Sequence, residues 1–374
     1  MKVNNILNLG IKELFSLKSD PALMILIVFI FTIAVYSVAT GVNLEVKKAS
    51  IAVVDEDRSP LSRQIVSALL PPIFLPPVEI HARDMNNALN SGEFVFILVF
   101  PPNFERDVLQ GKKPDLQLNA DASAMTMAGN GAVYIEQIIL AETINYIEPN
   151  RHVSDFLPVT MSIRKLFNPN SSSIWMNAVL QVVNNVTILG IILAGAAFIR
   201  EREHGTIEHL LCMPVTPSEI MLAKIWANGL VILIATLMSL ECVVHLGLGV
   251  PIHGSIMVFG LATVLYLFSV TSLGILLGTI TRTMAQFGLL IIPIVIVMYL
   301  LSGGTTPQDS MPDSLFAIMQ LSPSTYYVRL AQDILYRGAE LRDVWPRLII
   351  LTIIGSIFFM LSLMRFRRAI TTMR

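Results

Sequence analysis

The chain has 374 residues, of which 54% are hydrophobic and only 14% are charged. Because a soluble domain carries roughly 25% charged residues, this composition predicts an integral membrane protein. The formal net charge of −1 argues against a nucleic-acid-binding protein, which normally has a basic excess. The two cysteines, Cys212 and Cys242, suggest neither a metal-ligand spacing nor a disulfide framework, so they leave the redox compartment undecided.

The N-terminal segment predicts a surface helix followed by a membrane span. In residues 1–20, Leu7, Ile11 and Leu14 share one helical face, which indicates an amphipathic helix on the membrane surface. Residues 21–41 follow as the first transmembrane helix, since about 20 uncharged residues suffice to cross a bilayer. A cleavable signal peptide is the alternative, but its apolar region would be only about 7–15 residues long. We therefore interpret the segment as an uncleaved span.

Residues 42–173 differ from both flanking segments and predict an α/β domain. Strand-like runs alternate with helix-like runs, and the segment is long enough to have a core of its own. The predicted strands are Ala49–Asp55, Val78–Ala82, Phe94–Phe100, Asp115–Ala120 and Val159–Leu166, and the predicted helices are Pro60–Leu70, Asp84–Asn90, Phe104–Gln110 and Gly131–Ile147.

Four acidic residues in this domain, Asp55, Glu56, Asp57 and Asp121, could suggest a metal site. Residues of this kind more often form turns at strand ends or cap helices. We favour that interpretation.

Residues 174–374 predict five further transmembrane helices, so the fold class is an α-helical polytopic membrane protein with six spans and an inserted α/β domain. The five helices are Ile174–Ile199, Ile225–Gly249, Ile256–Ile280, Gln286–Leu301 and Leu348–Met364. A charged elbow, residues 200–224, joins the second span to the third.

A stretch of residues 302–346 between the fifth and sixth spans is too patterned for a plain loop. It predicts two short re-entrant helices, Leu315–Leu321 and Tyr326–Tyr336. Asp313 and Ser324 are the expected helix caps.

The distribution of Lys and Arg in the short connections predicts the orientation in the membrane. With a cytoplasmic N-terminus, the cytoplasmic side receives Lys2, Lys12, Lys18, Arg200, Arg202, Lys224, Arg282, Arg365, Arg367, Arg368 and Arg374. The short loops opposite are poor in basic residues. Both termini and the elbow are therefore expected in the cytoplasm, with the α/β domain on the other side.

The elbow itself predicts a short helix with one apolar side. Acidic residues stand in its first turn, Ile207, Leu210 and Leu211 recur at helical spacing, and Pro214 ends the pattern. Such a helix can insert into a groove of another protein or rest on the lipid surface. The pattern alone leaves both possibilities open.

The elbow sequence Arg202-Glu203-x-Gly205-Thr206-x-Glu208-x-Leu210-x-x-x-Pro214 resembles the signature of the type-2 ABC exporter permeases. Met311-Pro312 through Ile318, Leu321-x-Pro323-x-x-Tyr326 and Ile334-Leu335-Tyr336-Arg337-Gly338 are similar to further motifs of that family. The resemblance extends over the whole chain, and the most similar subgroup is that of Gram-negative inner-membrane permeases with a large periplasmic domain.

The resemblance implies that the elbow is a coupling helix that docks on a cytoplasmic ABC ATPase subunit. The residues expected to serve this coupling are Arg200, Glu201, Arg202, Glu203, Gly205, Thr206, Glu208, Leu210, Leu211 and Pro214. Glu201, Glu203 and Glu208 could pair with basic groups of the ATPase, or else face water or pair with the neighbouring arginines, where exposed pairs contribute about 0–1 kcal/mol.

The chain is not expected to be catalytic, nor to bind a metal or cofactor itself. It has no G-x-x-x-x-G-K-[ST] phosphate-binding loop, so ATP and magnesium would belong to the partner ATPase. Six spans make half of a pathway, which implies a second permease subunit as a homodimer or a related heterodimer. The subgroup also implies a periplasmic membrane-fusion adaptor and an outer-membrane channel.

Four polar residues within the spans are candidates for the translocation path, namely Asn184, Thr187, Glu241 and His245. Glu241 and His245 share a helical face, and an acid inside a membrane is a functional-site hypothesis by default. Snorkelling or a bond between helices would equally explain them. An otherwise apolar path favours a hydrophobic or amphiphilic substrate, drug-like or lipid-like.

Two other classes of protein remain as alternatives. An ion-coupled secondary transporter would show inverted repeats, broken midplane helices or paired buried charges, and apart from Glu241 none is evident. A membrane-anchored periplasmic scaffold would need only one or two spans. An adjacent gene for an ATPase with a phosphate-binding loop would favour the exporter.

Overall fold

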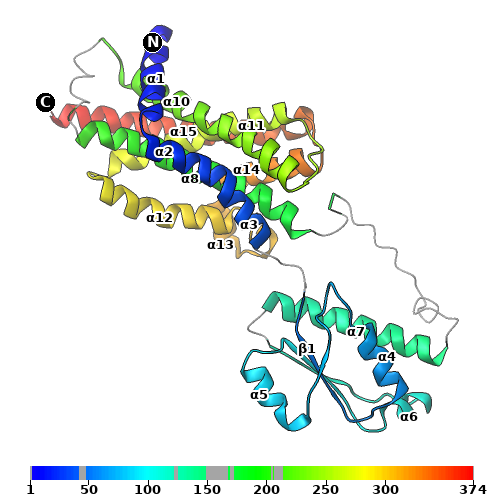
Figure 1. The fold of residues 1–374 in the computed structure, drawn as a ribbon. Helices are drawn as coiled ribbons and strands as arrows, with labels where there is room; N and C mark the ends of the chain where they lie inside the picture. Colours follow the sequence, from blue (N-terminus) through cyan, green and yellow to red (C-terminus); the bar gives the residue numbers. More distant parts are fainter. Residues whose placement is uncertain are drawn as a thin grey trace. The chain divides into compact units, whose positions relative to one another are not determined.

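A computed structural model describes residues 2–41, 48–121, 125–148, 167–168, 172–203, 205 and 214–373 (Figure 1). The chain divides into two compact units, one formed by residues 1–41 with 174–374 and the other by residues 42–173.

The first unit is helical, and its described residues include six helices that are long and apolar enough to cross a membrane. The N-terminal helix α1 (Val3–Lys18) precedes them. The spans are Pro21–Gly41 (α2, η1 and α3), α8 (Ser173–Glu203), Pro217–Gly247 (α10 and η5), α11 (Ile256–Ile280), α12 (Met284–Leu301) and α15 (Leu341–Met373). Between α12 and α15 lie η6 (Gln308–Ser310), α13 (Asp313–Met319), α14 (Pro323–Ala331) and η7 (Gln332–Tyr336).

Helix α8 is the centre of this unit. Within its most apolar stretch 72% of the residues are buried, against 17% in α12 and 22% in the first span. It approaches α11 closely, because a Cβ added at Gly274 would lie 2.4 Å from the carbonyl oxygen of Ile191. Such contact requires glycine, and it lets the two backbones pack directly. The other spans are arranged around α8 and keep more of their surface for lipid or protein partners.

Two spans contain π-helical segments, η1 (Ile30–Ala34) in the first span and η5 (Ser239–Gly247) at the end of the third. A π-helical turn displaces the regular backbone hydrogen bonds, and a membrane interior offers no water to replace them. Side chains supply the bonds here. The amide of Asn185 donates to the carbonyl of Ile30 at 2.7 Å, and the hydroxyl of Ser239 donates to that of Phe31 at 2.5 Å.

The second unit contains a four-stranded sheet of order β2-β1-β3-β4 in its described residues. The strands are β1 (Ile51–Asp55), β2 (Val78–Glu79), β3 (Phe96–Phe100) and β4 (Gln117–Ala120). Strand β1 runs parallel to β2 and β3, with Val53 opposite Leu98, and β4 pairs antiparallel with β3. This strand–helix alternation produces parallel neighbours through crossover helices.

Helices cover both faces of this sheet (Figure 1). On one face Ile51, Val53 and Leu98 pack with residues of α4 (Pro60–Ala68), α6 (Phe104–Leu109) and α7 (Met125–Ile147). On the other face Ala52, Val54 and Ile97 pack with residues of α5 (Met85–Asn90). Since successive strand residues point to opposite faces, this division explains why residues 51–54 of β1 and all of β3 are apolar.

Several sequence expectations differ from the observed elements. Helix α8 continues through Arg200 to Glu203, and α10 already begins at Pro217, so the connection between them is shorter than residues 200–224. The predicted strand Val159–Leu166 lies outside the described residues.

The prediction that Asp313 and Ser324 cap the short helices is wrong. The N-cap positions of α13 and α14 are Pro312 and Ser322, and neither forms a side-chain capping bond. Ser324 instead lies within 2.8 Å of the hydroxyl of Ser322. In the second unit, Asp55 accepts from the N–H of Arg58 at 2.8 Å and Asp57 from the N–H of Glu105 at 3.0 Å, which are turn and capping contacts.

Candidate functional site

The C-terminal end of α8 carries four consecutive charged residues, which contact three other parts of the first unit. Arg200 pairs with Asp20 at 3.7 Å, Glu201 pairs with Lys224 at 2.9 Å, Arg202 donates to the carbonyl of Thr281, and Glu203 accepts from the N–H of Met284 at 2.9 Å. These partners come from the start of the first span, from α10, and from the junction of α11 with α12. The side chains therefore hold the end of the second span against other helices of the first unit.

The described ends of the elbow show how the chain leaves α8 and enters α10. Gly205 has φ +67°, and its N–H donates to the carbonyl of Arg202 at 3.2 Å. A residue in this left-handed conformation commonly terminates a helix, and glycine adopts it without strain. Helix α10 begins with a capping box, in which Thr216 and Glu219 each accept from the other's backbone N–H.

Four of the residues expected to serve coupling lie outside the described residues, namely Thr206, Glu208, Leu210 and Leu211. Pro214, at the far end, is described, and its carbonyl accepts from the side-chain amide of Asn5 at 3.4 Å.

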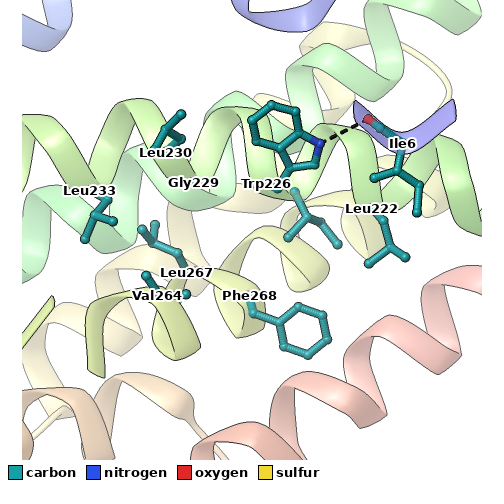
Figure 2. Close-up of a pocket in the computed structure, with 10 residues that line it drawn as sticks. Ile6, Leu222, Trp226, Gly229, Leu230, Leu233, Val264, Leu267 and Phe268 are labelled. Atoms are coloured by element: carbon teal, nitrogen blue, oxygen red, sulfur yellow. Dashed lines mark hydrogen bonds between the residues drawn. The ribbon is translucent and has the colours of Figure 1, made fainter. Parts of the chain in front are cut away.

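Helix α1 packs along α10, and its first turn contacts Pro214 at the end of the elbow. The indole N–H of Trp226 donates to the carbonyl of Ile6 at 3.1 Å (Figure 2). A Cβ added at Gly10 would lie 2.1 Å from the Trp226 ring, so the helix rests directly on the indole. The carboxylate of Glu219 accepts from the backbone N–H of Lys2 at 2.6 Å. The interfacial helix predicted for residues 1–20 is thus packed onto the third span.

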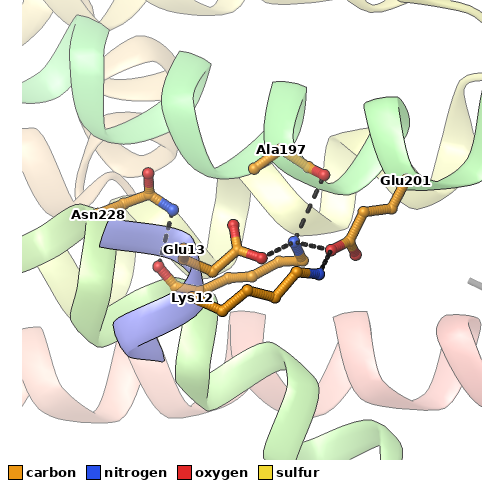
Figure 3. A network of polar contacts seen from close by, with 6 residues as sticks. Lys12, Glu13, Ala197, Glu201 and Asn228 are labelled. Atoms are coloured by element: carbon orange, nitrogen blue, oxygen red, sulfur yellow. Dashed lines mark hydrogen bonds and ion pairs between the residues drawn. The ribbon is translucent and has the colours of Figure 1, made fainter. Parts of the chain in front are cut away.

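A buried ion network lies where α1, α8 and α10 meet (Figure 3). Lys224 is 1% exposed, and its ammonium lies 3.1 Å from Glu13 and 2.9 Å from Glu201. Figure 3 shows these two carboxylates reaching the same ammonium from two sides. Lys12, at the outside, lies 3.7 Å from Glu201. Because an isolated buried charge is very unfavourable, this network favours an arrangement in which the three helices stay packed together.

Sequence reasoning missed two members of this network, Lys224 and Glu13. Lys224 stands inside α10, seven positions after its first residue, Pro217. A lysine within a membrane helix is a signal for a buried partner. The signal was weakened because the span was predicted to begin only at Ile225.

The pathway candidates Asn184 and Thr187 are buried in α8. The hydroxyl of Thr187 lies 2.6 Å from that of Tyr266, whose ring stacks on Tyr327 at a centroid distance of 4.0 Å. Thr187 thus joins α8 to α11 and α14 rather than lining an open space. Asn184 is 8% exposed, whereas the neighbouring Asn185 makes the bond to the first span.

The other two candidates, Glu241 and His245, lie on the exposed side of the π-helical segment η5. The Nδ1 atom of His245 is 3.0 Å from the carbonyl of Val250, and a carbonyl only accepts, so Nδ1 carries the hydrogen. Since Asn184 and Thr187 are buried while Glu241 and His245 are exposed, the four residues do not form one surface of this chain.

Comparisons with known proteins concern the family of the chain. A family model described as ABC-2 family transporter protein matches residues 22–364. The inner membrane transport permease YhhJ of Escherichia coli K12 is 49% identical over 371 residues, which cover 99% of each chain. The probable multidrug ABC transporter permeases YbhR and YbhS of the same strain are 25% and 26% identical, covering 92% and 88% of this chain and 94% and 88% of the relatives.

Replacing Lys224 by methionine should destabilise the first unit strongly. The substitution leaves Glu13 and Glu201 buried without their cation, and losing one partner of a buried pair costs about 3–5 kcal/mol. Denaturant unfolding of the purified chain in detergent would measure this loss. The triple variant Lys224→Met, Glu13→Gln, Glu201→Gln should recover much of it, because no uncompensated charge remains.

The matched control is Lys12→Met, which removes a cation from the same network at a position that is 56% exposed. Its effect should stay below about 1 kcal/mol, as for exposed pairs generally. Equal destabilisation by the two single variants would show that burial of the Lys224 charge is not what holds α1, α8 and α10 together.

Proposed function

Because this chain belongs to the ABC-2 transporter family, as an inner-membrane transport permease rather than a catalytic protein, we propose that it is the membrane subunit of an ATP-driven exporter. A separate cytoplasmic ABC ATPase would supply the energy, since the sequence contains no phosphate-binding loop. Two permease subunits, either identical or related, would enclose the pathway.

The main observation in support of this proposal is that side-chain contacts hold the chain in place on both sides of the elbow. On one side, four charged residues fix the end of α8. On the other, the Thr216–Glu219 capping box starts α10. A force applied to residues 204–216 would therefore act on the second and third spans together, as a rigid-body transition requires. The ATPase would contact the elbow beyond the end of α8, because Glu201 and Glu203 already form contacts within this chain.

The proposed cargo is hydrophobic or amphiphilic. Two relatives bear the name of probable multidrug permeases. An apolar groove of about 380 Å³ lies between the first and third spans, lined by residues that include Phe31, Met238 and Cys242. A second, of about 450 Å³, lies between α1, α10 and α11 (Figure 2). Surfaces of this kind suit apolar ligands.

The proposed orientation has both termini and the elbow in the cytoplasm, and the α/β unit of residues 42–173 in the periplasm. The excess of Lys and Arg in the cytoplasmic connections supports it. In that position the α/β unit could contact a membrane-fusion adaptor leading to an outer-membrane channel.

Affinity capture of the tagged chain from its own membranes tests the central claim. The expected result is co-purification of a polypeptide that has a phosphate-binding loop and hydrolyses ATP. The double variant Leu210→Asp, Leu211→Asp should lower its recovery by more than about tenfold, because it places charges in an apolar interface. Normal recovery with this variant would contradict docking through the elbow.

The control for this capture is Leu70→Asp, which adds a charge to an exposed leucine in the second unit. It should leave recovery of the ATPase unchanged. If neither the natural chain nor the control captures an ATPase, the exporter proposal fails as a whole.

Gly205 allows a sharper test of coupling. Its positive φ disfavours β-branched residues by about 1–2 kcal/mol, but no atom would crowd an added Cβ within 4 Å, and asparagine tolerates this conformation. In proteoliposomes with the ATPase, Gly205→Val should lower substrate-stimulated ATP hydrolysis roughly 5–30-fold. Gly205→Asn should retain most of it. Similar activity in both variants would show that the turn geometry is unimportant for coupling.

The two native cysteines allow a test of orientation. With Cys242 replaced by serine, Cys212 in the elbow should react with a membrane-impermeant maleimide in inverted vesicles but not in intact spheroplasts. A cysteine introduced at Ser67, an exposed position in the second unit, should show the opposite pattern. Labelling of Cys212 from the outside would reverse the proposed topology.

A further inference from the structure

A small polar cavity lies beside the buried ion network, at the junction of α1, the first span and α8. Its volume is about 150 Å³. The residues that line it are Lys12, Glu13, Ser16, Leu17, Asp20, Leu23, Ala197, Arg200 and Glu201. None of the transport and coupling roles discussed above uses this cavity.

The cavity lies at the start of the first span and near the end of the second, where the headgroups of a surrounding bilayer are expected. Asp20 is the N-cap of the helix that begins the first span, and Arg200 stands three residues before the end of the second. Charged groups line one part of the cavity, whereas Leu17 and Leu23 line another. A ligand that fits this arrangement has a polar head at the membrane boundary and an apolar continuation along the first span.

Two cations of the lining keep hydrogen-bond donors available for a ligand. Lys12 is 56% exposed and Arg200 is 42% exposed. Their ion pairs, with Glu201 and Asp20, are both 3.7 Å long, beyond the 2.7–3.2 Å range of N–H···O hydrogen bonds. A phosphate between these two groups could form the shorter, charge-assisted bonds that the carboxylates do not.

The lining also keeps an acceptor available. One oxygen of Glu13 lies 3.1 Å from Lys224, whereas its other oxygen accepts no hydrogen bond within the described part of the chain. The Oδ1 atom of Asp20 accepts from the N–H of Leu23 at 3.1 Å, and its Oδ2 atom makes only the long contact with Arg200. A primary ammonium could donate to both carboxylates.

Charge balance decides which lipid fits. The cavity and its floor contain three cations, Lys12, Arg200 and Lys224, and three anions, Glu13, Asp20 and Glu201. This set is neutral, so a purely anionic or purely cationic ligand would leave an excess charge in a partly buried site. A zwitterion leaves the balance unchanged.

We propose that this cavity binds the headgroup of a phospholipid with a primary ammonium, as in phosphatidylethanolamine. The phosphate lies between Lys12 and Arg200, the ammonium donates to Glu13 and Asp20, and the acyl chains continue past Leu17 and Leu23. The bound lipid thereby joins α1 to the end of α8.

Native mass spectrometry of the delipidated full chain tests this site without any ATPase, so its failure would leave the exporter proposal intact. Phosphatidylethanolamine, phosphatidylcholine and phosphatidylglycerol with identical acyl chains are titrated in parallel. Phosphatidylethanolamine should bind about tenfold more tightly than either, because a trimethylammonium has no N–H donor and glycerol carries no positive charge. Equal binding of the three lipids would overturn the proposal.

The double variant Lys12→Gln, Arg200→Gln should weaken the binding of all three lipids by more than about tenfold, because it removes the two cations that contact their common phosphate. The matched control Lys18→Gln, Arg282→Gln removes the same two charge types at exposed positions that do not line the cavity, and it should keep the affinity of the natural chain. Unchanged affinity in the first variant would refute the site. Free O-phosphoethanolamine should not compete with the lipid, and competition at equal concentration would show that a soluble phosphate ester is the ligand instead.

Discussion

A polar group without a partner is costly in a membrane interior, and this constraint explains the main contacts between the helices of the first unit. The amino group of Lys224 is buried between the carboxylates of Glu13 and Glu201, which come from two other helices. The carbonyls of the π-helical turn in the first span are likewise satisfied by Asn185 and Ser239. Each of these contacts joins helices that are distant in sequence. The need to satisfy polar groups therefore fixes how the spans are arranged.

The same contacts restrain the two helix ends between which the elbow lies. If α8 and α10 could move independently, a displacement of the elbow would bend the chain locally and would move neither span as a whole. Here the end of α8 is bonded to the first span, to α10 and to the α11–α12 junction, and α1 lies along α10 through Trp226. These contacts join the adjacent ends of the first three spans to one another. Helix α1 contributes to these contacts as a packed element and not merely as a membrane anchor.

The proposed lipid site and the two apolar grooves have linings of different character. The cavity beside Lys12 and Arg200 is lined in part by charged side chains of both signs. The two grooves described above are lined almost entirely by apolar atoms. The first kind of surface can select a headgroup by hydrogen bonding. The second can accept many apolar molecules, because hydrophobic contacts are not directional. Specific lipid binding and broad cargo acceptance are thus compatible within one permease.

The sequence by itself determined the class of the protein. Uncharged runs of sufficient length identified the six spans, the elbow motif indicated the transporter family, and alternating strand and helix patterns identified the elements of the second unit, since these signals are local in the chain. Local signals also gave α10 a start that was too late, because Lys224 looked like the end of a cytoplasmic loop.

Only the tertiary structure decided which polar residues act together. Glu13 and Lys224 are 211 residues apart, and Asn185 and Ile30 are 155 apart, so no periodicity could relate them. For the same reason the sequence left open whether Thr187 lines a pathway or joins two helices, and the structure places its hydroxyl 2.6 Å from that of Tyr266 on another helix. A sequence shows that a buried charge or amide needs a partner. Which side chain provides it depends on how the helices pack, and that is a property of the folded chain.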